Sequence, residues 1–103
     1  MTASDLIALA RAHHINVVFA DLGRYEGHEL RSEFDPSEPM IRINARLVDV
    51  MKPEQADRFI AQAIAHELFH YLEHRGEIRA AQNRKLRERL ADRFARTFIA
   101  SST

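Results

Sequence analysis

The sequence predicts an α+β domain with three main helices and a small, three-stranded, mostly antiparallel sheet. Three short segments rich in β-branched and aromatic residues lie in the first half of the chain. Two longer segments in the second half repeat apolar residues at the spacing of amphipathic helices. A chain of 103 residues can bury one modest core, so we expect residues 1–103 to form a single domain.

The N-terminal half is predicted to contain one helix and three strands. Ser4 and Asp5 can cap a helix that ends near His13. Alternating or β-branched residues then predict three strands, over residues 16–20, 28–34 and 40–44. The composition of residues 35–39, Asp-Pro-Ser-Glu-Pro, indicates a turn and therefore an antiparallel pair of strands around it.

The C-terminal half is predicted to contain two longer helices. Pro53 at a first-turn position, with the acids Glu54 and Asp57 nearby, favours the start of the first one. Gly76 favours its end, because glycine readily adopts the conformation that terminates a helix. The second helix covers residues 84–99, with apolar side chains on one arc and basic side chains opposite.

The first of these helices contains His-Glu-Leu-Phe-His at residues 66–70, which has the pattern HExxH. Histidines four residues apart on a helix are separated by about 40° and ~6 Å, so both rings can bind one small cation. A catalytic zinc ion takes neutral imidazole nitrogens and uses three protein ligands, which leaves a position for water. Glu67 lies where it can act on that water as a general base. The pattern therefore indicates metal-assisted hydrolysis.

The same pattern also occurs by chance on amphipathic helices, so a third ligand has to decide between the two interpretations. Glu88 and Asp92 are the candidates, one turn apart at the margin of the apolar arc of the second helix. Carboxylates on the packed side of a helix need a cation or a donor nearby. A zinc ion and one of its histidines would supply both.

The two helices together resemble the ImmA/IrrE family of zinc metallopeptidases. HExxH followed by ExxxD is similar to the glutamate-zincin arrangement, and residues 66–74 and 88–95 match the family patterns HELxHyxxH and ExxAxxFA. Phe69 stands where the family usually has Gly or Ala. The resemblance implies three Zn²⁺ ligands, which are His66, His70 and Glu88. It also implies that Glu67 is the general base and that Asp92 braces a ligand histidine.

The resemblance also implies a partner. ImmA/IrrE-like peptidases typically act on, or alongside, helix-turn-helix transcriptional repressors, so we expect a specific protein substrate of this kind. The 15 basic and 15 acidic residues cancel, which predicts no general attraction to nucleic acid or to a membrane. The absence of cysteine, and of any segment resembling a signal peptide or membrane span, favours the cytoplasm.

Other polar residues near the pattern receive different interpretations. His74 is ~12 Å along the helix from His66, too far for all three histidines to share one ion, so we interpret it as structural. Glu73 and Glu77 are fallback ligands, although Glu73 is expected on the helix face opposite the site. Three further side chains could donate to an oxyanion but are interpreted as packing residues: Tyr25, His28 and Tyr71.

An alternative function is a non-catalytic, metal-binding interaction module that regulates a partner by binding it. Eight basic residues lie between Arg75 and Arg96. They fit a solvated helix face, and they also fit a surface for an acidic partner.

Overall fold

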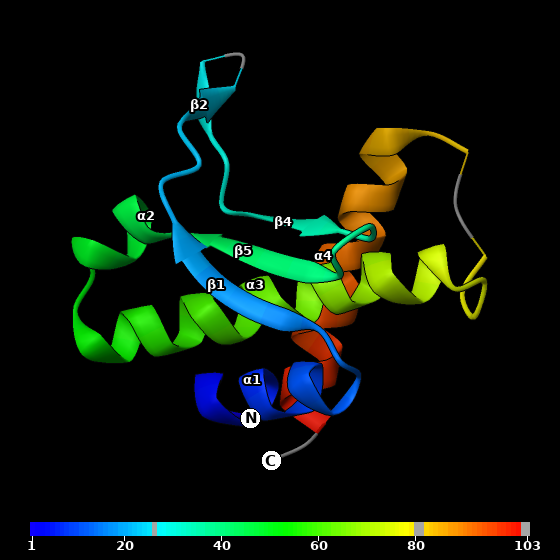
Figure 1. Ribbon diagram of the computed structural model, residues 1–103, viewed down its shortest axis with the longest axis horizontal. Coiled ribbons are helices and arrows are strands. Elements are labelled where there is room, and N and C mark those ends of the chain that lie inside the picture. Colours follow the sequence, from blue (N-terminus) through cyan, green and yellow to red (C-terminus); the bar gives the residue numbers. More distant parts are fainter. Residues whose placement is uncertain (26, 80–81, 102–103) are drawn as a thin grey trace.

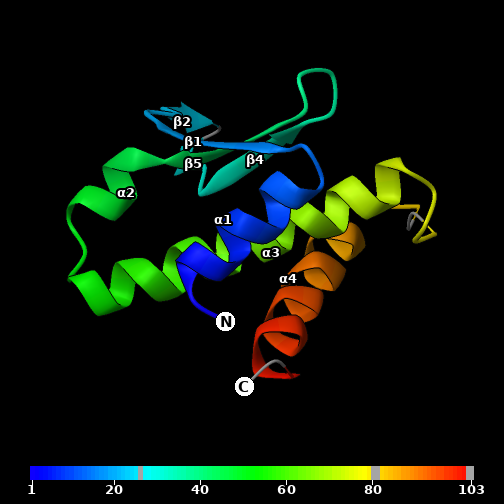
Figure 2. The same ribbon diagram turned by 60° about the horizontal axis from the view of Figure 1, so that its bottom comes forward.

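The computed structural model confirms the α+β class. It describes residues 1–25, 27–79 and 82–101, and within them it contains four helices and a three-stranded mixed sheet (Figure 1). Helix α3 runs between the sheet and α4 (Figure 2). The elements in chain order are α1 (Ala3–Ala12), β1 (Asn16–Ala20), β2 (Arg24–Tyr25), β3 (His28–Glu29), β4 (Ser32–Asp35), β5 (Met40–Asn44), α2 (Ala45–Asp49), α3 (Pro53–His74) and α4 (Arg84–Ser101).

Helix α1 begins earlier than expected. Its N-cap is Thr2, whose side chain accepts a hydrogen bond from the backbone N–H of Asp5, and the Asp5 carboxylate accepts one from the backbone N–H of Thr2. This reciprocal pair satisfies two donors that the helix itself leaves unpaired. The expected cap at Ser4 and Asp5 was therefore wrong in position, and Asp5 belongs to the first turn instead.

The sheet has the strand order β1-β5-β4, with β4 and β1 at its edges. The β4–β5 pair is antiparallel across the expected turn, and the β1–β5 pair is parallel. The parallel pair is possible because the chain leaves the sheet after β1 and makes the separate β2–β3 ribbon before it returns. Ile41 and Ile43 in the central strand are fully buried against the helices.

The single strand expected over residues 28–34 is divided into β3 and β4. Asn44, a fully buried polar residue, lies at the division. Its backbone N–H donates to the carbonyl oxygen of Arg31, and its side-chain amide donates to the carbonyl oxygen of Leu30 at 2.8 Å. Its side-chain oxygen also caps α2 by accepting from the N–H of Arg46. One side chain thus fixes where β4 starts and where β5 ends.

The expected limits of α3 agree with the structure, since Pro53 is its first residue and Gly76, at φ +79°, follows its C-cap. Its burial extends to more than one face because α1, the sheet and α4 all pack against it. Phe69 is buried against α4, with its ring centroid 5.6 Å from that of Phe94. The bulky ring of Phe69 therefore packs between the two longest helices.

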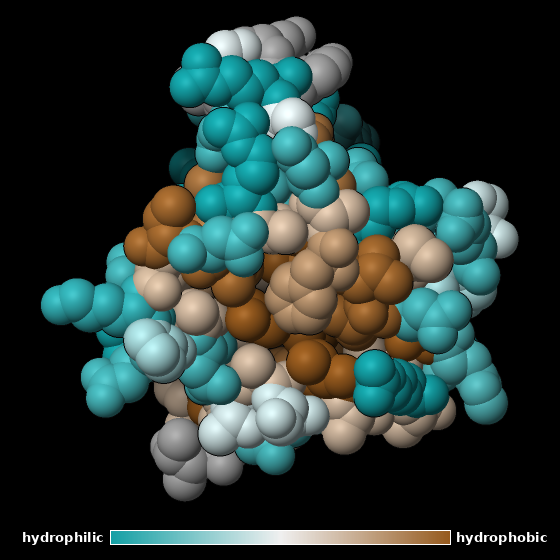
Figure 3. Space-filling model, turned by 60° about the vertical axis from the view of Figure 1, so that its left-hand side comes forward, coloured by the Kyte–Doolittle hydropathy of each residue, from teal (hydrophilic) through white to brown (hydrophobic). Residues whose placement is uncertain are grey.

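One face of the molecule exposes apolar side chains at its centre (Figure 3). β1 and α2 lie on this side of the molecule, and they include or adjoin two large exposed hydrophobic residues, Phe19 at 46% and Val50 at 85% exposure. Among the described helices, none is both long and apolar enough to cross a membrane.

We expect Phe69→Ala to lower the free energy of unfolding by about 3–5 kcal/mol, because it opens a cavity between α3 and α4. Urea unfolding followed by circular dichroism measures the change. Phe19→Ala is the matched control. Because Phe19 is 46% exposed, its replacement should lower the free energy of unfolding much less. Equal losses in both variants would contradict the packing role of Phe69.

Candidate metal centre

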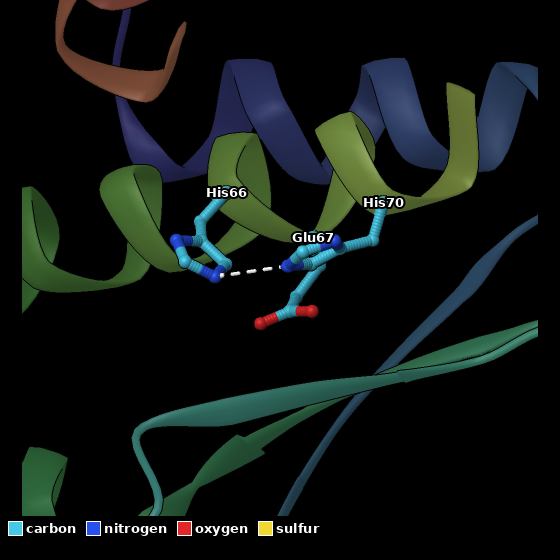
Figure 4. A group of neighbouring side chains, drawn as sticks. All are labelled: His66, Glu67 and His70. Atoms are coloured by element: carbon cyan, nitrogen blue, oxygen red, sulfur yellow. Dashed lines mark hydrogen bonds between the residues drawn. The ribbon is translucent and has the colours of Figure 1, made fainter. Parts of the chain in front are cut away.

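His66 and His70 project from the same side of α3 as Glu67 (Figure 4). The two Nε2 atoms lie 3.2 Å apart. Both imidazoles are only about 15% exposed. One donor atom from each of the three residues lies within 4.8 Å of the others, and the group could hold a metal ion.

Glu88 approaches the same point from α4. One of its carboxylate oxygens lies 2.9 Å from Nε2 of His66, and the other lies 3.3 Å from Nε2 of His70. Ligands about 2.0–2.1 Å from a tetrahedral zinc ion are separated from one another by about 3.3 Å. The two Nε2 atoms and the Glu88 carboxylate are therefore spaced as ligand groups around a single ion would be.

Each histidine ring is held by a carboxylate on its other nitrogen. Nδ1 of His66 lies 2.8 Å from Asp92, and Nδ1 of His70 lies 2.8 Å from Glu73. Both Nε2 atoms face each other and the Glu88 carboxylate. A metal ion bound at both Nε2 atoms would leave the Nδ1–H of each ring to donate to its carboxylate, which can only accept. The cation would also offset the mutual repulsion of the groups around it.

Glu67 occupies a different position from the three donors. It is 4% exposed, and its Oε2 accepts a hydrogen bond from the hydroxyl of Ser32 on β4. Burial raises the pKa of Glu67 above its usual value, while the Ser32 hydrogen bond and the two histidines oppose that rise. A raised pKa makes this carboxylate a stronger base than an exposed one.

Two clefts open beside His66, Glu67 and Glu88, and these three residues line both clefts. One, of about 490 Å³, extends toward the N-terminal half of α3 and is lined by residues such as Phe59 and Gln62. The other, of about 670 Å³, extends toward the C-terminal end of α3 and is lined by residues such as His74 and Arg87. Leu30 and the edge-strand residue Ser32 line both. The space along β4 therefore continues past the metal centre on both sides.

Comparisons of this chain with models of protein families, with curated proteins and with solved structures gave no match.

The structure brings together all five residues singled out by the sequence: His66, Glu67, His70, Glu88 and Asp92. It corrects the placement of Glu73, which was expected opposite the site. The Glu73 side chain is 3% exposed and contacts His70, because α4 covers the helix face that periodicity alone assigned to solvent. Glu77 lies beyond the end of α3, where it is exposed and pairs with Arg75 at 3.6 Å.

The remaining candidates lie outside the ring of donors. His74 is exposed, with its ring 6.5 Å from that of Phe34. The ring of Tyr71 packs edge-on against Phe34, and its hydroxyl accepts from Arg75 at 2.7 Å. The side chains of Tyr25 and His28 are not among those that the structure describes.

Sequence reasoning missed Ser32 and placed Glu73 on the wrong helix face, and each residue had a signal. Ser32 alternates with Leu30 and Phe34, a pattern that places its hydroxyl on the same strand face as these apolar residues, where it requires a partner. Glu73 is three residues after His70, a spacing at which helix side chains meet.

Proposed function

We propose that the protein is a zinc-dependent endopeptidase, as its resemblance to the ImmA/IrrE family implies. The observation that carries the proposal is the set of separations of 2.9, 3.2 and 3.3 Å among Nε2 of His66, Nε2 of His70 and the carboxylate of Glu88. Two imidazoles and one carboxylate are a donor set that suits zinc and that leaves a coordination position open.

When bound, a zinc ion would supply Lewis-acid polarisation of the scissile carbonyl group. Glu67 takes a proton from the attacking water and passes it to the leaving amine, so the elements of water are added across the broken C–N bond. Ser32 donates to Oε2 of Glu67, which leaves Oε1 for the water. Asp92 holds the ring of His66 in the orientation that directs Nε2 toward the metal.

An extended substrate has an obvious place to bind. β4 is an edge strand of the sheet, and its residue Ser32 lines both clefts. A peptide added to the free edge of β4 would gain main-chain hydrogen bonds without a requirement for particular side chains. It would also pass the metal centre, because both clefts include His66 and Glu67.

The substrate we propose is one specific protein in the cytoplasm, of the helix-turn-helix repressor class that the family resemblance implies. A domain of 103 residues has few surfaces with which to hold arbitrary chains in register. Specific cleavage therefore requires that the partner supply contacts of its own.

We expect the zinc-loaded protein to cut the product of a neighbouring regulator gene at one or a few positions and to leave casein almost intact. Intact mass spectrometry reads the fragments, whose masses sum to that of the regulator plus one water for each cut. Chelator-treated protein is the control. Broad digestion of unrelated unfolded proteins would contradict the specific-partner proposal.

A second candidate function is an interaction module that binds a partner without cutting it. The exposed apolar area in Figure 3 favours this candidate, because such areas often mark contact surfaces. Exposed basic residues along α4 add a second surface: Arg84, Lys85, Arg89, Arg93 and Arg96. Stable binding of the regulator with no fragments would favour the module over the peptidase.

A further inference from the structure

Glu73 is a buried carboxylate that peptide hydrolysis as described above does not use. Its side chain is 3% exposed on α3. One oxygen lies 2.8 Å from Nδ1 of His70, and both oxygens lie 3.4 Å from guanidinium nitrogens of Arg87 on α4. Burying a carboxylate is costly unless it is paired, and this one is paired with a proposed metal ligand.

We propose that Glu73 and Arg87 are positioning residues of the metal centre. Glu73 fixes the ring and the tautomer of His70, so that Nε2 carries the free lone pair. Arg87 holds Glu73 and thereby the turn of α4 that presents Glu88. The inference rests on the proposed zinc site and does not depend on which peptide is cut.

The contacts form a closed ring across two helices. Glu88 contacts His70, His70 contacts Glu73, Glu73 contacts Arg87, and Arg87 adjoins Glu88 in the chain. A shift of α4 along α3 would therefore break the pairing of Glu73 and the approach of Glu88 together. The ligand from α4 is held in register with the ligands from α3 by a contact that is not itself a ligand.

The same arrangement occurs at His66, one helical turn earlier on α3. Because both proposed ligands have a carboxylate on Nδ1, the contact of Glu73 is more than the ordinary pairing of a buried charge. His66 has the carboxylate of Asp92 on Nδ1, as His70 has that of Glu73. In both rings the carboxylate contacts Nδ1, and Nε2 is the nitrogen that faces Glu88. A hydrogen bond of this kind orients the ring, selects the tautomer and makes the ligand nitrogen more basic.

Zinc affinity, measured by competition with a chromogenic chelator at fixed pH, tests the inference. We expect Glu73→Gln to weaken zinc binding by about 10–100-fold. Arg87→Gln should weaken it by a smaller factor, because it acts through Glu73. Two exposed residues provide matched controls for the lost charges, and both variants should bind zinc as the wild type does: Glu77→Gln and Arg58→Gln.

The tautomer of His70 gives a second readout that needs neither zinc nor substrate. In the metal-free wild type, ¹⁵N NMR of the imidazole should show the proton on Nδ1 of His70. Glu73→Leu removes the acceptor, and we expect the proton to move to Nε2, the tautomer that free histidine prefers. The ring of His66 should keep its proton on Nδ1 in this variant, because Asp92 is unchanged.

Failure of this inference is distinguishable from failure of the proposed function. If the wild type binds no zinc, the peptidase proposal fails and the tautomer of the metal-free protein still decides the role of Glu73. Unchanged zinc affinity and tautomer in the Glu73 variants would overturn the inference, as would an equal loss of affinity in Arg58→Gln. If burial makes the Glu73 variants unfold, Arg87→Gln decides, since the Arg87 side chain is 41% exposed.

Discussion

Replacing Glu67 with Gln should lower the rate of peptide cleavage by about 10²–10⁴-fold while zinc binding and folding remain intact. The amide cannot take a proton from water, yet it has the size of the carboxylate and can still accept a hydrogen bond from Ser32. The other donor atoms of the metal centre are untouched. The loss should therefore appear in kcat, with little change in zinc affinity.

The measurement is cleavage of the regulator under single-turnover conditions, with zinc content determined on the same samples. Glu54→Gln, an exposed acid in the first turn of the same helix, is the matched control and should cleave as the wild type does. Cleavage at an undiminished rate by Glu67→Gln would rule out Glu67 as the base. Full function of this variant in the cell would instead favour the interaction module.

Glu88→Ala should have the largest effect on the metal itself. It removes one of three proposed protein ligands, so we expect zinc affinity to fall by more than the 10–100-fold typical for loss of a group that hydrogen-bonds a ligand. The loss of zinc affinity in Asp92→Ala should fall within that range, because Asp92 contacts Nδ1 of His66 and not the proposed metal position. Chelator competition measures both.

Arg89→Ala is the control for these α4 variants, since Arg89 is an exposed neighbour of Glu88 in the chain. It should bind zinc as tightly as the wild type. If Asp92→Ala lost the metal while Glu88→Ala retained it, the roles of the two carboxylates would be reversed.

The local parts of the fold could be predicted because they depend on neighbours in the chain. Helical spacing alone places His66, Glu67 and His70 on one side of α3, and Pro53 and Gly76 mark its ends. The parallel β1–β5 pair could not be predicted, because it depends on where the chain returns after the β2–β3 ribbon. Strand composition gives no information on that path.

In the candidate metal centre, too, the features that depend on how separate elements pack could not be predicted from the sequence. A helical wheel assigns faces from one helix's own apolar residues, so it placed Glu73 on the solvent side. The structure places α4 there, and Arg87 and His70 enclose the carboxylate. The approach of Glu88 to the two histidines was predicted from a two-helix motif, and the distances depend on packing contacts such as that of Phe69 with Phe94.

Anomalous diffraction from zinc-loaded crystals, recorded on both sides of the zinc absorption edge, tests the metal centre most directly. We expect a single peak bonded to Nε2 of His66, Nε2 of His70 and the carboxylate of Glu88, with Glu67 near the ion and not bonded to it. A peak bonded to Glu67 in place of Glu88, a peak elsewhere on the molecule, or no peak would contradict the account.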